Sequence, residues 1–148
     1  MPDVYVPHRL HADEFLTLRG LRQHVLRWGR PRADRPLLVL LHGWMDVGAS
    51  FQFVVDALRE EREICALDWR GFGLSETSGS DCYWFPDYLG DLDALLDALS
   101  PEAPVDLLGH SMGGNVAMSY AGVRPARVRR LVNLEGFGMP DVAAAAAP

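Results

Sequence analysis

The most informative stretch of the sequence is Val105-Asp106-Leu107-Leu108-Gly109-His110-Ser111-Met112-Gly113-Gly114, where a short apolar run meets a segment of small residues. The run 105–108 has the composition of a buried strand, and residues 112–123 read as a helix that ends before Pro125. Ser111 therefore lies on a sharp turn between a strand and a helix. The glycines two positions before and after it leave room for this turn, which holds the serine hydroxyl clear of the sheet.

A serine in this position has the surroundings of a nucleophile. In the pattern Gly109-x-Ser111-x-Gly113 the hydroxyl stands at a helix N-terminus, where the free N–H of Met112 and the helix dipole favour a developing oxyanion. A glycine-rich turn whose serine only caps the helix would use the same residue types. The strand before the serine and the small-residue helix after it favour the first interpretation, so we predict that Ser111 is a catalytic nucleophile.

Strands and helices alternate over the rest of the chain. The run 37–41 is apolar throughout, as in a strand that is buried on both faces of a parallel sheet. Residues 14–19 and 21–28 read as an antiparallel hairpin. The pattern predicts an α/β fold with a mostly parallel sheet and flanking helices. The other candidates are strands at 64–67, 105–108 and 128–134, a helix at 51–58 with Ser50 as its N-cap, and a helix at 85–99 with Asp87, Asp91, Asp93 and Asp97 off its apolar face.

The loop after the first buried strand, His42-Gly43-Trp44, completes the predicted site. The carboxyl ends of parallel strands meet at one edge of a sheet, so this loop should lie beside the turn that carries Ser111. The backbone N–H groups of Trp44 and Met112 would then form an oxyanion hole with two donors. We interpret His42 as a residue that braces its own loop by hydrogen bonds.

Composition and charge exclude several other classes of protein. The 148 residues are 49% hydrophobic and 23% charged, which fits one folded domain and not a disordered chain. All fourteen cations are scattered arginines in a chain of net charge −6, so no nucleic-acid partner is expected. No apolar run is long enough to span a bilayer, so no membrane partner is expected either.

Cysteine usage and ligand spacing add two further expectations. Cys65 and Cys82 are too few for a disulfide framework, and the first residues lack the apolar core of a signal peptide, so we expect a cytoplasmic protein. No histidine–cysteine cluster has the spacing of metal ligands, and no glycine-rich loop carries the lysine of a phosphate-binding motif. We therefore expect neither a metal nor a cofactor.

Three motifs, in this order and spacing, resemble the N-terminal half of an α/β-hydrolase. They are the His42-Gly43 loop, the segment Asp68-Trp69-Arg70-Gly71-Phe72-Gly73-Leu74-Ser75 and the turn around Ser111, and the resemblance covers about residues 14–140. It implies that the glycines and the arginine of the middle motif are structural. The supporting residues that it implies around the nucleophile are His42, Gly43, Gly109, His110 and Gly113.

The resemblance also implies a reaction class. The chain is similar to the serine-hydrolase-like branch, which is related to epoxide hydrolases and dehalogenases. Those relatives have an aspartate at the turn where this chain has Ser111. The resemblance therefore points to hydrolysis of a small-molecule carboxylic ester or similar acyl substrate by a serine hydrolase. Carbon–carbon bond hydrolysis, amide hydrolysis and acyl transfer use the same machinery and stay open.

Glu135 directly follows the strand candidate 128–134 and has two interpretations. In dehalogenase-like members of the superfamily the acid of the catalytic triad lies at this strand end, and a carboxylate there could orient an imidazolium. Alternatively, Glu135 serves the loop or contacts substrate, and the triad acid follows one strand later.

The sequence shows no general base. In the family the histidine follows both the nucleophile and the acid, yet no histidine comes after Ser111. His110 should point away from the serine hydroxyl, and we expect surface positions for His8, His11 and His24. Losing the base of a serine triad costs on the order of 10⁶ in turnover, so this chain alone should be close to inactive.

These observations lead to an expectation about the extent of the domain. We expect residues 1–148 to be a single but incomplete α/β-hydrolase core that stops after the sixth strand, with the lid and the C-terminal part of the core absent. The last strand would then be an exposed sheet edge through which the chain could self-associate. The alternative function is a catalytically inactive fragment or binding domain that retains the serine turn.

Overall fold

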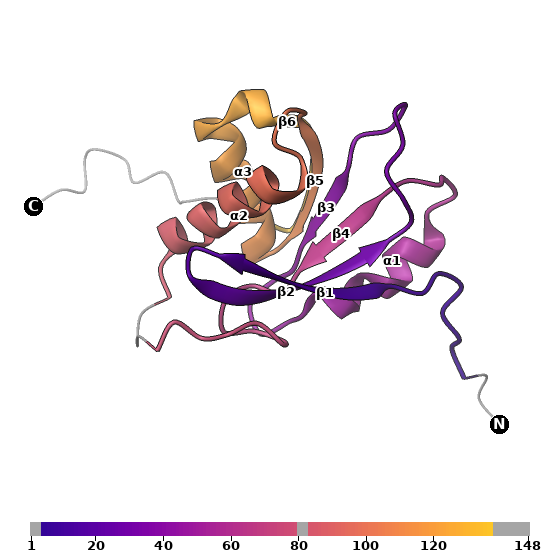
Figure 1. Ribbon diagram of the computed structural model, residues 1–148, viewed down its shortest axis with the longest axis horizontal. Coiled ribbons are helices and arrows are strands. Elements are labelled where there is room, and N and C mark those ends of the chain that lie inside the picture. Colours follow the sequence, from indigo (N-terminus) through magenta and orange to yellow (C-terminus); the bar gives the residue numbers. More distant parts are fainter. Residues whose placement is uncertain (1–3, 80–82, 138–148) are drawn as a thin grey trace, which may run out of the picture.

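The chain folds around one six-stranded sheet. The computed structural model describes residues 4–79 and 83–137. The strands are β1 (Ala12–Leu18), β2 (Leu21–Trp28), β3 (Leu38–Leu41), β4 (Ile64–Leu67), β5 (Val105–His110) and β6 (Val128–Leu134). They lie in the order β1-β2-β4-β3-β5-β6, as Figure 1 shows.

The direction of the strands confirms the predicted α/β fold. Strand β3 is parallel to β4 and β5, and β5 is parallel to β6. Strands β1 and β2 form the expected antiparallel hairpin, and β2 runs antiparallel to β4. Because β3, β4 and β5 all end at one edge, the loops that follow them gather there.

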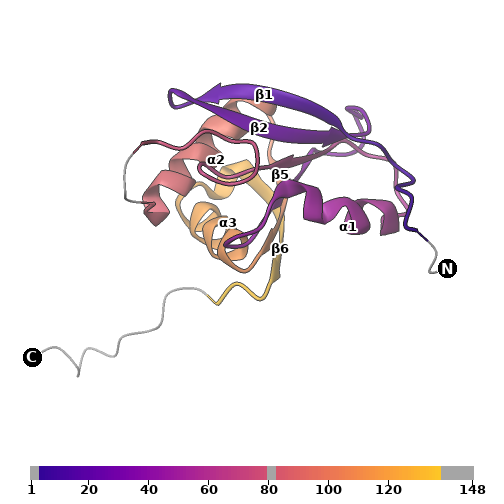
Figure 2. The ribbon, with the colours of Figure 1, turned by 90° about the horizontal axis from the view of Figure 1, so that it is seen from below.

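Helices cover both faces of the sheet. A short 3₁₀ helix (Gly48–Phe51) and helix α1 (Gln52–Ala57) lie on one face, and α2 (Phe85–Leu99) and α3 (Met112–Val123) lie on the other (Figure 2). A second 3₁₀ helix, Pro125–Arg127, leads from α3 into β6. Both α2 and α3 have the bounds that their apolar spacing and the position of Pro125 predict.

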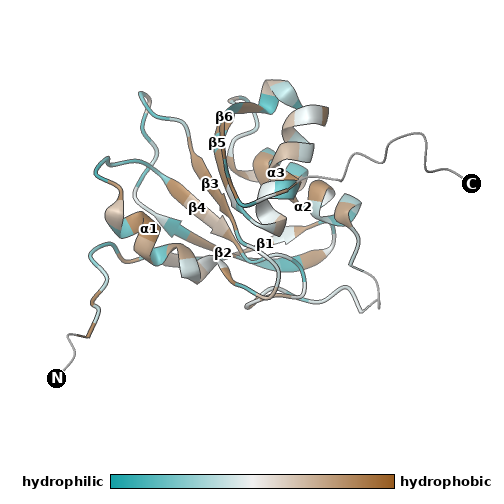
Figure 3. Cartoon of the chain, turned by 180° about the vertical axis from the view of Figure 1, so that it is seen from behind, coloured by the Kyte–Doolittle hydropathy of each residue, from teal (hydrophilic) through white to brown (hydrophobic). Residues whose placement is uncertain are grey.

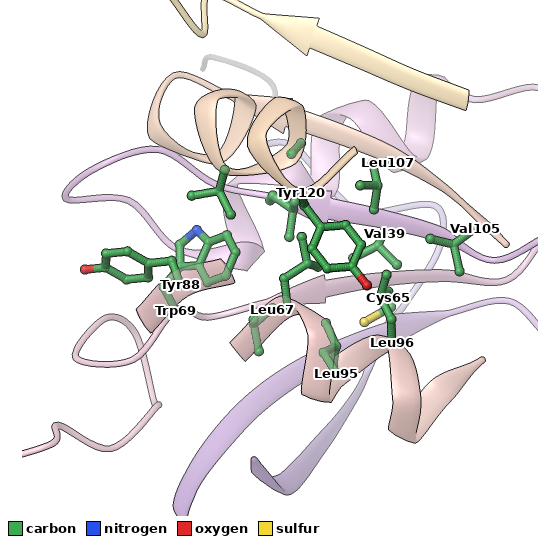
Figure 4. Packing of buried hydrophobic residues seen from close by; sticks show 14 of the residues in the cluster. Val39, Cys65, Leu67, Trp69, Tyr88, Leu95, Leu96, Val105, Leu107 and Tyr120 are labelled. Atoms are coloured by element: carbon green, nitrogen blue, oxygen red, sulfur yellow. The ribbon is translucent and has the colours of Figure 1, made fainter. Parts of the chain in front are cut away.

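The central strands are buried on both faces, as their unbroken apolar runs predict, and Figure 3 shows this apolar centre. Alternate side chains enter two separate clusters. Toward α2 and α3 the strands β3 and β4 direct Val39, Leu41, Cys65 and Leu67. Figure 4 shows Val39, Cys65 and Leu67 in the same cluster as Trp69, Tyr88 and Tyr120. Toward α1 they direct Leu38, Leu40, Ile64 and Ala66.

Two local predictions are wrong. Ser50 does not cap α1, because it lies inside the preceding 3₁₀ helix and its hydroxyl bonds to the carboxylate of Asp46. Asp91 does not lie off the buried face of α2, because it is fully buried and bonded to Arg70. Within the described part of the chain, no helix has both the length and the apolarity to cross a membrane.

Strand β6 lies at one edge of the sheet. Two of its apolar side chains, Val132 and Leu134, remain 47% and 41% exposed. An open strand with exposed apolar side chains is a surface on which further chain can pair.

Candidate active site

Ser111 lies on the turn between β5 and α3, with φ 50° and ψ −116°. L-residues rarely adopt such dihedrals, and the strain costs on the order of 1–3 kcal/mol. The turn is held from both sides. The N–H of Ser111 donates to the carbonyl of Leu134 at the end of β6 over 2.8 Å, and its own carbonyl accepts from Asn115 in α3 over 3.0 Å.

The glycines around the serine are required by close backbone contacts. A Cβ on Gly109 would lie 2.4 Å from the carbonyl oxygen of Gly113. A Cβ on Gly113 would lie 2.1 Å from the carbonyl oxygen of Leu41, the last residue of β3. Atoms cannot approach so closely, so any larger residue would push α3 away from the strands. The sharp strand–turn–helix geometry therefore depends on both glycines.

The loop after β3 lies directly against the serine turn. A Cβ on Gly43 would lie 3.2 Å from Cβ of Ser111 and 3.2 Å from Nδ1 of His110. The predicted approach of the two loops is thus observed. His110 is half-buried, and its ring nitrogen faces Gly43.

Two backbone donors next to the serine have no partner among the described residues. Met112 is the first residue of α3, so its N–H has no acceptor within the helix. Trp44 is the residue after Gly43, and its N–H makes no hydrogen bond to a described residue.

His42 braces the loop that carries Trp44. The N–H of Trp69 donates to Nε2 of His42 over 3.1 Å, so the ring proton lies on Nδ1, which donates to the carbonyl of Gly43 over 2.8 Å. Burial lowers the pKa of His42 below its ordinary value, in keeping with a neutral ring. Both nitrogens are occupied, and neither is free to accept a proton from Ser111.

The segment 68–75 supports this loop from the other side. The ring of Phe72 contacts the rings of Trp44 and His42, at centroid distances of 5.2 and 5.7 Å. Arg70 binds the buried carboxylate of Asp91 through two hydrogen bonds of 2.6 and 2.5 Å. The arginine of this motif is therefore structural, as the resemblance implied.

Glu135 comes one residue after the carbonyl that accepts from Ser111. Its φ is 57°, its side chain is exposed, and it makes no hydrogen bond or ion pair to a described residue. The side chain of Asn133 holds this turn, because its oxygen accepts from the N–H of Gly136 and its amide donates to the carbonyl of the same residue. Glu135 is thus held beside the nucleophile by its backbone, and its carboxylate bonds to none of the described residues.

The histidines differ in part from expectation. His8 and His11 lie in the exposed N-terminal segment, as predicted. His24 does not lie on the surface, because it is buried and both of its ring nitrogens face carboxylates. Within the described residues, no histidine hydrogen-bonds to Ser111.

Sequence reasoning missed three residues that shape the site: His24, Asp91 and Asn133. The first two carry a usable signal. His24 shares a strand face with Leu26 and Trp28, and period-two alternation directs that face inward. Asp91 lies three residues after Tyr88 and four before Leu95, on the edge of the apolar stripe of α2.

A cleft lies away from the serine. It has a volume of about 680 Å³ and lies at the opposite edge of the sheet, where Leu37, Glu63 and Pro104 precede their strands. Ligands of α/β sheets bind at the carboxyl ends of the strands, so we give greater weight to the edge that carries Ser111. Residues that the resemblance covers beyond 137, and Cys82, lie outside the described residues.

Comparison with known proteins yields a consistent group of similar chains. A family model for the alpha/beta hydrolase fold matches residues 36–147. A "Serine hydrolase-like protein" of Danio rerio is 37% identical over 112 residues, which are 75% of this chain and 33% of that protein. The "Cis-3-alkyl-4-alkyloxetan-2-one decarboxylase" of Shewanella oneidensis is 32% identical over 146 residues, which are 95% of this chain and 43% of that protein.

Solved structures agree with the sequence matches. The crystal structure of a membrane phospholipase A superimposes with a TM-score of 0.78 at 25% identity and covers 90% of this chain, but only 42% of its own chain is matched. This chain thus spans between a third and a half of the length of the relatives reported.

Proposed function

The chain belongs to the α/β-hydrolase fold family, and on that premise we propose that it supplies the nucleophile and oxyanion hole of a serine hydrolase for carboxylic-ester-type substrates. The observation that supports the proposal most strongly is the strained turn at Ser111, next to the N–H groups of Trp44 and Met112, which have no partner among residues 4–79 and 83–137. Strain at a non-glycine residue persists only where surrounding contacts enforce it, and such residues cluster at functional sites.

The reaction follows from this geometry. The oxygen of Ser111 attacks the substrate carbonyl carbon and forms a carbon–oxygen bond, while the carbonyl electrons move onto the carbonyl oxygen. The N–H groups of Trp44 and Met112 stabilise that oxyanion. Collapse of the intermediate expels the alcohol, which takes a proton from the base, and water then hydrolyses the acyl-enzyme.

A base must accept the proton of Ser111, and the described histidines are engaged elsewhere or do not reach it. We propose that this base is a histidine supplied by a segment outside these 148 residues. The chain matches only 33% to 43% of the length of its two relatives reported above, which leaves room for such a segment. Without the base, the oxyanion hole and binding retain on the order of 10³-fold acceleration over water.

The role of Glu135 has two alternatives, triad acid or loop residue. If Glu135 is the triad acid, the substitution Glu135→Gln should lower kcat about 10⁴-fold with little effect on stability. The measurement needs a longer form of the protein that includes the base. If the triad acid comes from a later strand, the same variant should retain most of its activity. Steady-state kinetics on a simple ester distinguishes the two.

Labelling by a fluorophosphonate tests the proposal. We expect the probe to attach to Ser111 rapidly in a longer form from the same reading frame and slowly in the 148-residue chain. Ser111→Ala should abolish labelling, whereas Ser119→Ala, an exposed serine of the same helix, should leave it unchanged. A folded longer form that stays unlabelled at Ser111 would contradict the proposal and favour a binding domain.

A further inference from the structure

His24 occupies a buried position between two carboxylates. It lies in β2 and is 3% exposed. Its Nδ1 is 2.8 Å from Oδ2 of Asp68, and its Nε2 is 2.9 Å from Oδ1 of Asp13. The proposed hydrolase mechanism makes no use of this histidine, although its partner Asp68 belongs to the motif beside the active site.

The number of protons on the ring determines which of its contacts can be hydrogen bonds. A carboxylate only accepts hydrogen bonds, and a neutral imidazole has a single N–H to donate. Asp68 already accepts from the backbone N–H groups of Gly48, over 2.6 Å, and Leu74, over 3.0 Å, as an ionised carboxylate does. Both ring nitrogens of His24 must carry protons for both contacts to be hydrogen bonds to ionised carboxylates. An imidazolium meets this requirement, whereas a neutral ring leaves one of the two contacts without a proton.

The surroundings of His24 are consistent with this charge. From β1 it meets Asp13 and the ring of Phe15, at a centroid distance of 5.0 Å, and from the segment after β4 it meets Asp68. Nε2 of His11 is 3.5 Å from the same oxygen of Asp13. Arg22 stacks over the Phe15 ring. Two carboxylates thus contact the ring of His24 directly.

Asp68 connects this cation to the oxyanion loop. One of its oxygens fixes Gly48, the end of the loop that begins at Gly43 against Ser111. The other oxygen fixes Leu74, two residues after the Phe72 ring that packs on Trp44. Both segments that set the position of the Trp44 N–H are therefore tied to one buried carboxylate.

We infer that His24 is a positioning residue: as an imidazolium it neutralises buried Asp68 and so holds the loop that presents the Trp44 N–H to the oxyanion. A buried carboxylate without a countercharge is costly and would draw in water or a proton, which weakens its bonds to Gly48 and Leu74. A cleft of about 360 Å³ borders this arrangement, and His24, Asp13 and Asp68 all contribute to its lining. The inference depends on the proposed function only for the role of Trp44.

Ring ¹⁵N spectroscopy of the 148-residue chain tests the charge directly. In the folded chain both ring nitrogens of His24 should carry protons. A His24 ring with a single proton would overturn the inference. This measurement needs neither a variant nor enzyme activity.

Amide hydrogen exchange tests the connection to the loop. In His24→Gln the amides of Gly48 and Leu74 should exchange about 10- to 100-fold faster than in the unmodified chain. The amide of Ser111, which bonds to Leu134, should be unaffected. The control is His11→Gln, which lines the same cleft without touching Asp68. Unchanged exchange at Gly48 and Leu74 in a folded His24→Gln chain would contradict the link.

Reactivity then separates the inference from the proposed function. In the longer form, His24→Gln should lower the rate of fluorophosphonate labelling and kcat about tenfold and change KM little, whereas His11→Gln should change neither. If Ser111 is unlabelled even in the unmodified longer form, the proposed function fails while the ring-proton and exchange results still stand. If the unmodified longer form is labelled at Ser111 and His24→Gln is labelled at the same rate, the positioning role of His24 is wrong while the proposed function stands.

Discussion

The strain at Ser111 makes a quantitative prediction about stability. At φ 50° and ψ −116° a residue with a Cβ loses on the order of 1–3 kcal/mol, whereas glycine accepts these dihedrals freely. Glycine also gains about 0.5–1 kcal/mol of entropy in the unfolded chain, which opposes the relief of strain. The difference is about 1 kcal/mol in favour of glycine. Ser111→Gly should therefore be more stable than Ser111→Ala, although both lack the hydroxyl.

Thermal and urea unfolding measure this difference. For a chain of about this size 1 kcal/mol corresponds to about 2–4 °C in Tm. The matched control is Ser119, an exposed residue inside the regular helix α3. There the Ser119→Gly variant should be about 1 kcal/mol less stable than the Ser119→Ala variant. The sign of the glycine–alanine difference should thus reverse between two serines eight residues apart. Equal stability of the two Ser111 variants, or the same sign at both sites, would refute the assignment of strain to the turn.

Three further predictions concern packing, a buried ion pair and the sheet edge. Gly113→Ala should destabilise the fold by about 3 kcal/mol or more in urea unfolding, because its Cβ would meet backbone, whereas Gly122→Ala in the same helix should stabilise it by about 1 kcal/mol. Asp91→Asn should cost about 2–3 kcal/mol, since it removes the buried carboxylate that holds Arg70 through two hydrogen bonds and leaves that arginine only its ion pair with Asp87. Asp87→Asn weakens only longer ion pairs of 3.5 and 3.6 Å with Arg70 and Arg19, so it should cost under about 1 kcal/mol. The 148-residue chain should form dimers through β6 in light scattering, and Val132→Glu should shift it toward monomer; a monomer at all concentrations would contradict this.

The fold was predictable because its strands are short, apolar and separated by clear turn signals. Strands β4 and β6 span residues 64–67 and 128–134, which are the ranges that their composition predicts. The helix 112–123 is equally well defined, since it lies between a glycine-rich turn and Pro125. Local composition thus agrees with tertiary structure over most of the chain.

The site was only partly predictable, because some of its features depend on contacts between distant segments. The approach of Gly43 to Ser111 follows from parallel strand order and was predicted. The burial of His24 and Asp91 depends on partners 44 and 21 residues away, and polar residue types by themselves suggest the surface. The positive φ of Glu135 likewise arises from the turn held by Asn133 and has no signature in its residue type.

The crystal structure of the phosphonylated protein tests the central claim, that Ser111 is a nucleophile served by two backbone donors. We expect phosphorus bonded to Oγ of Ser111, with the phosphonyl oxygen about 2.7–3.1 Å from the backbone nitrogens of both Trp44 and Met112. A phosphonyl oxygen that points to solvent, or that is bound by other groups while these two nitrogens remain unpartnered, would contradict it.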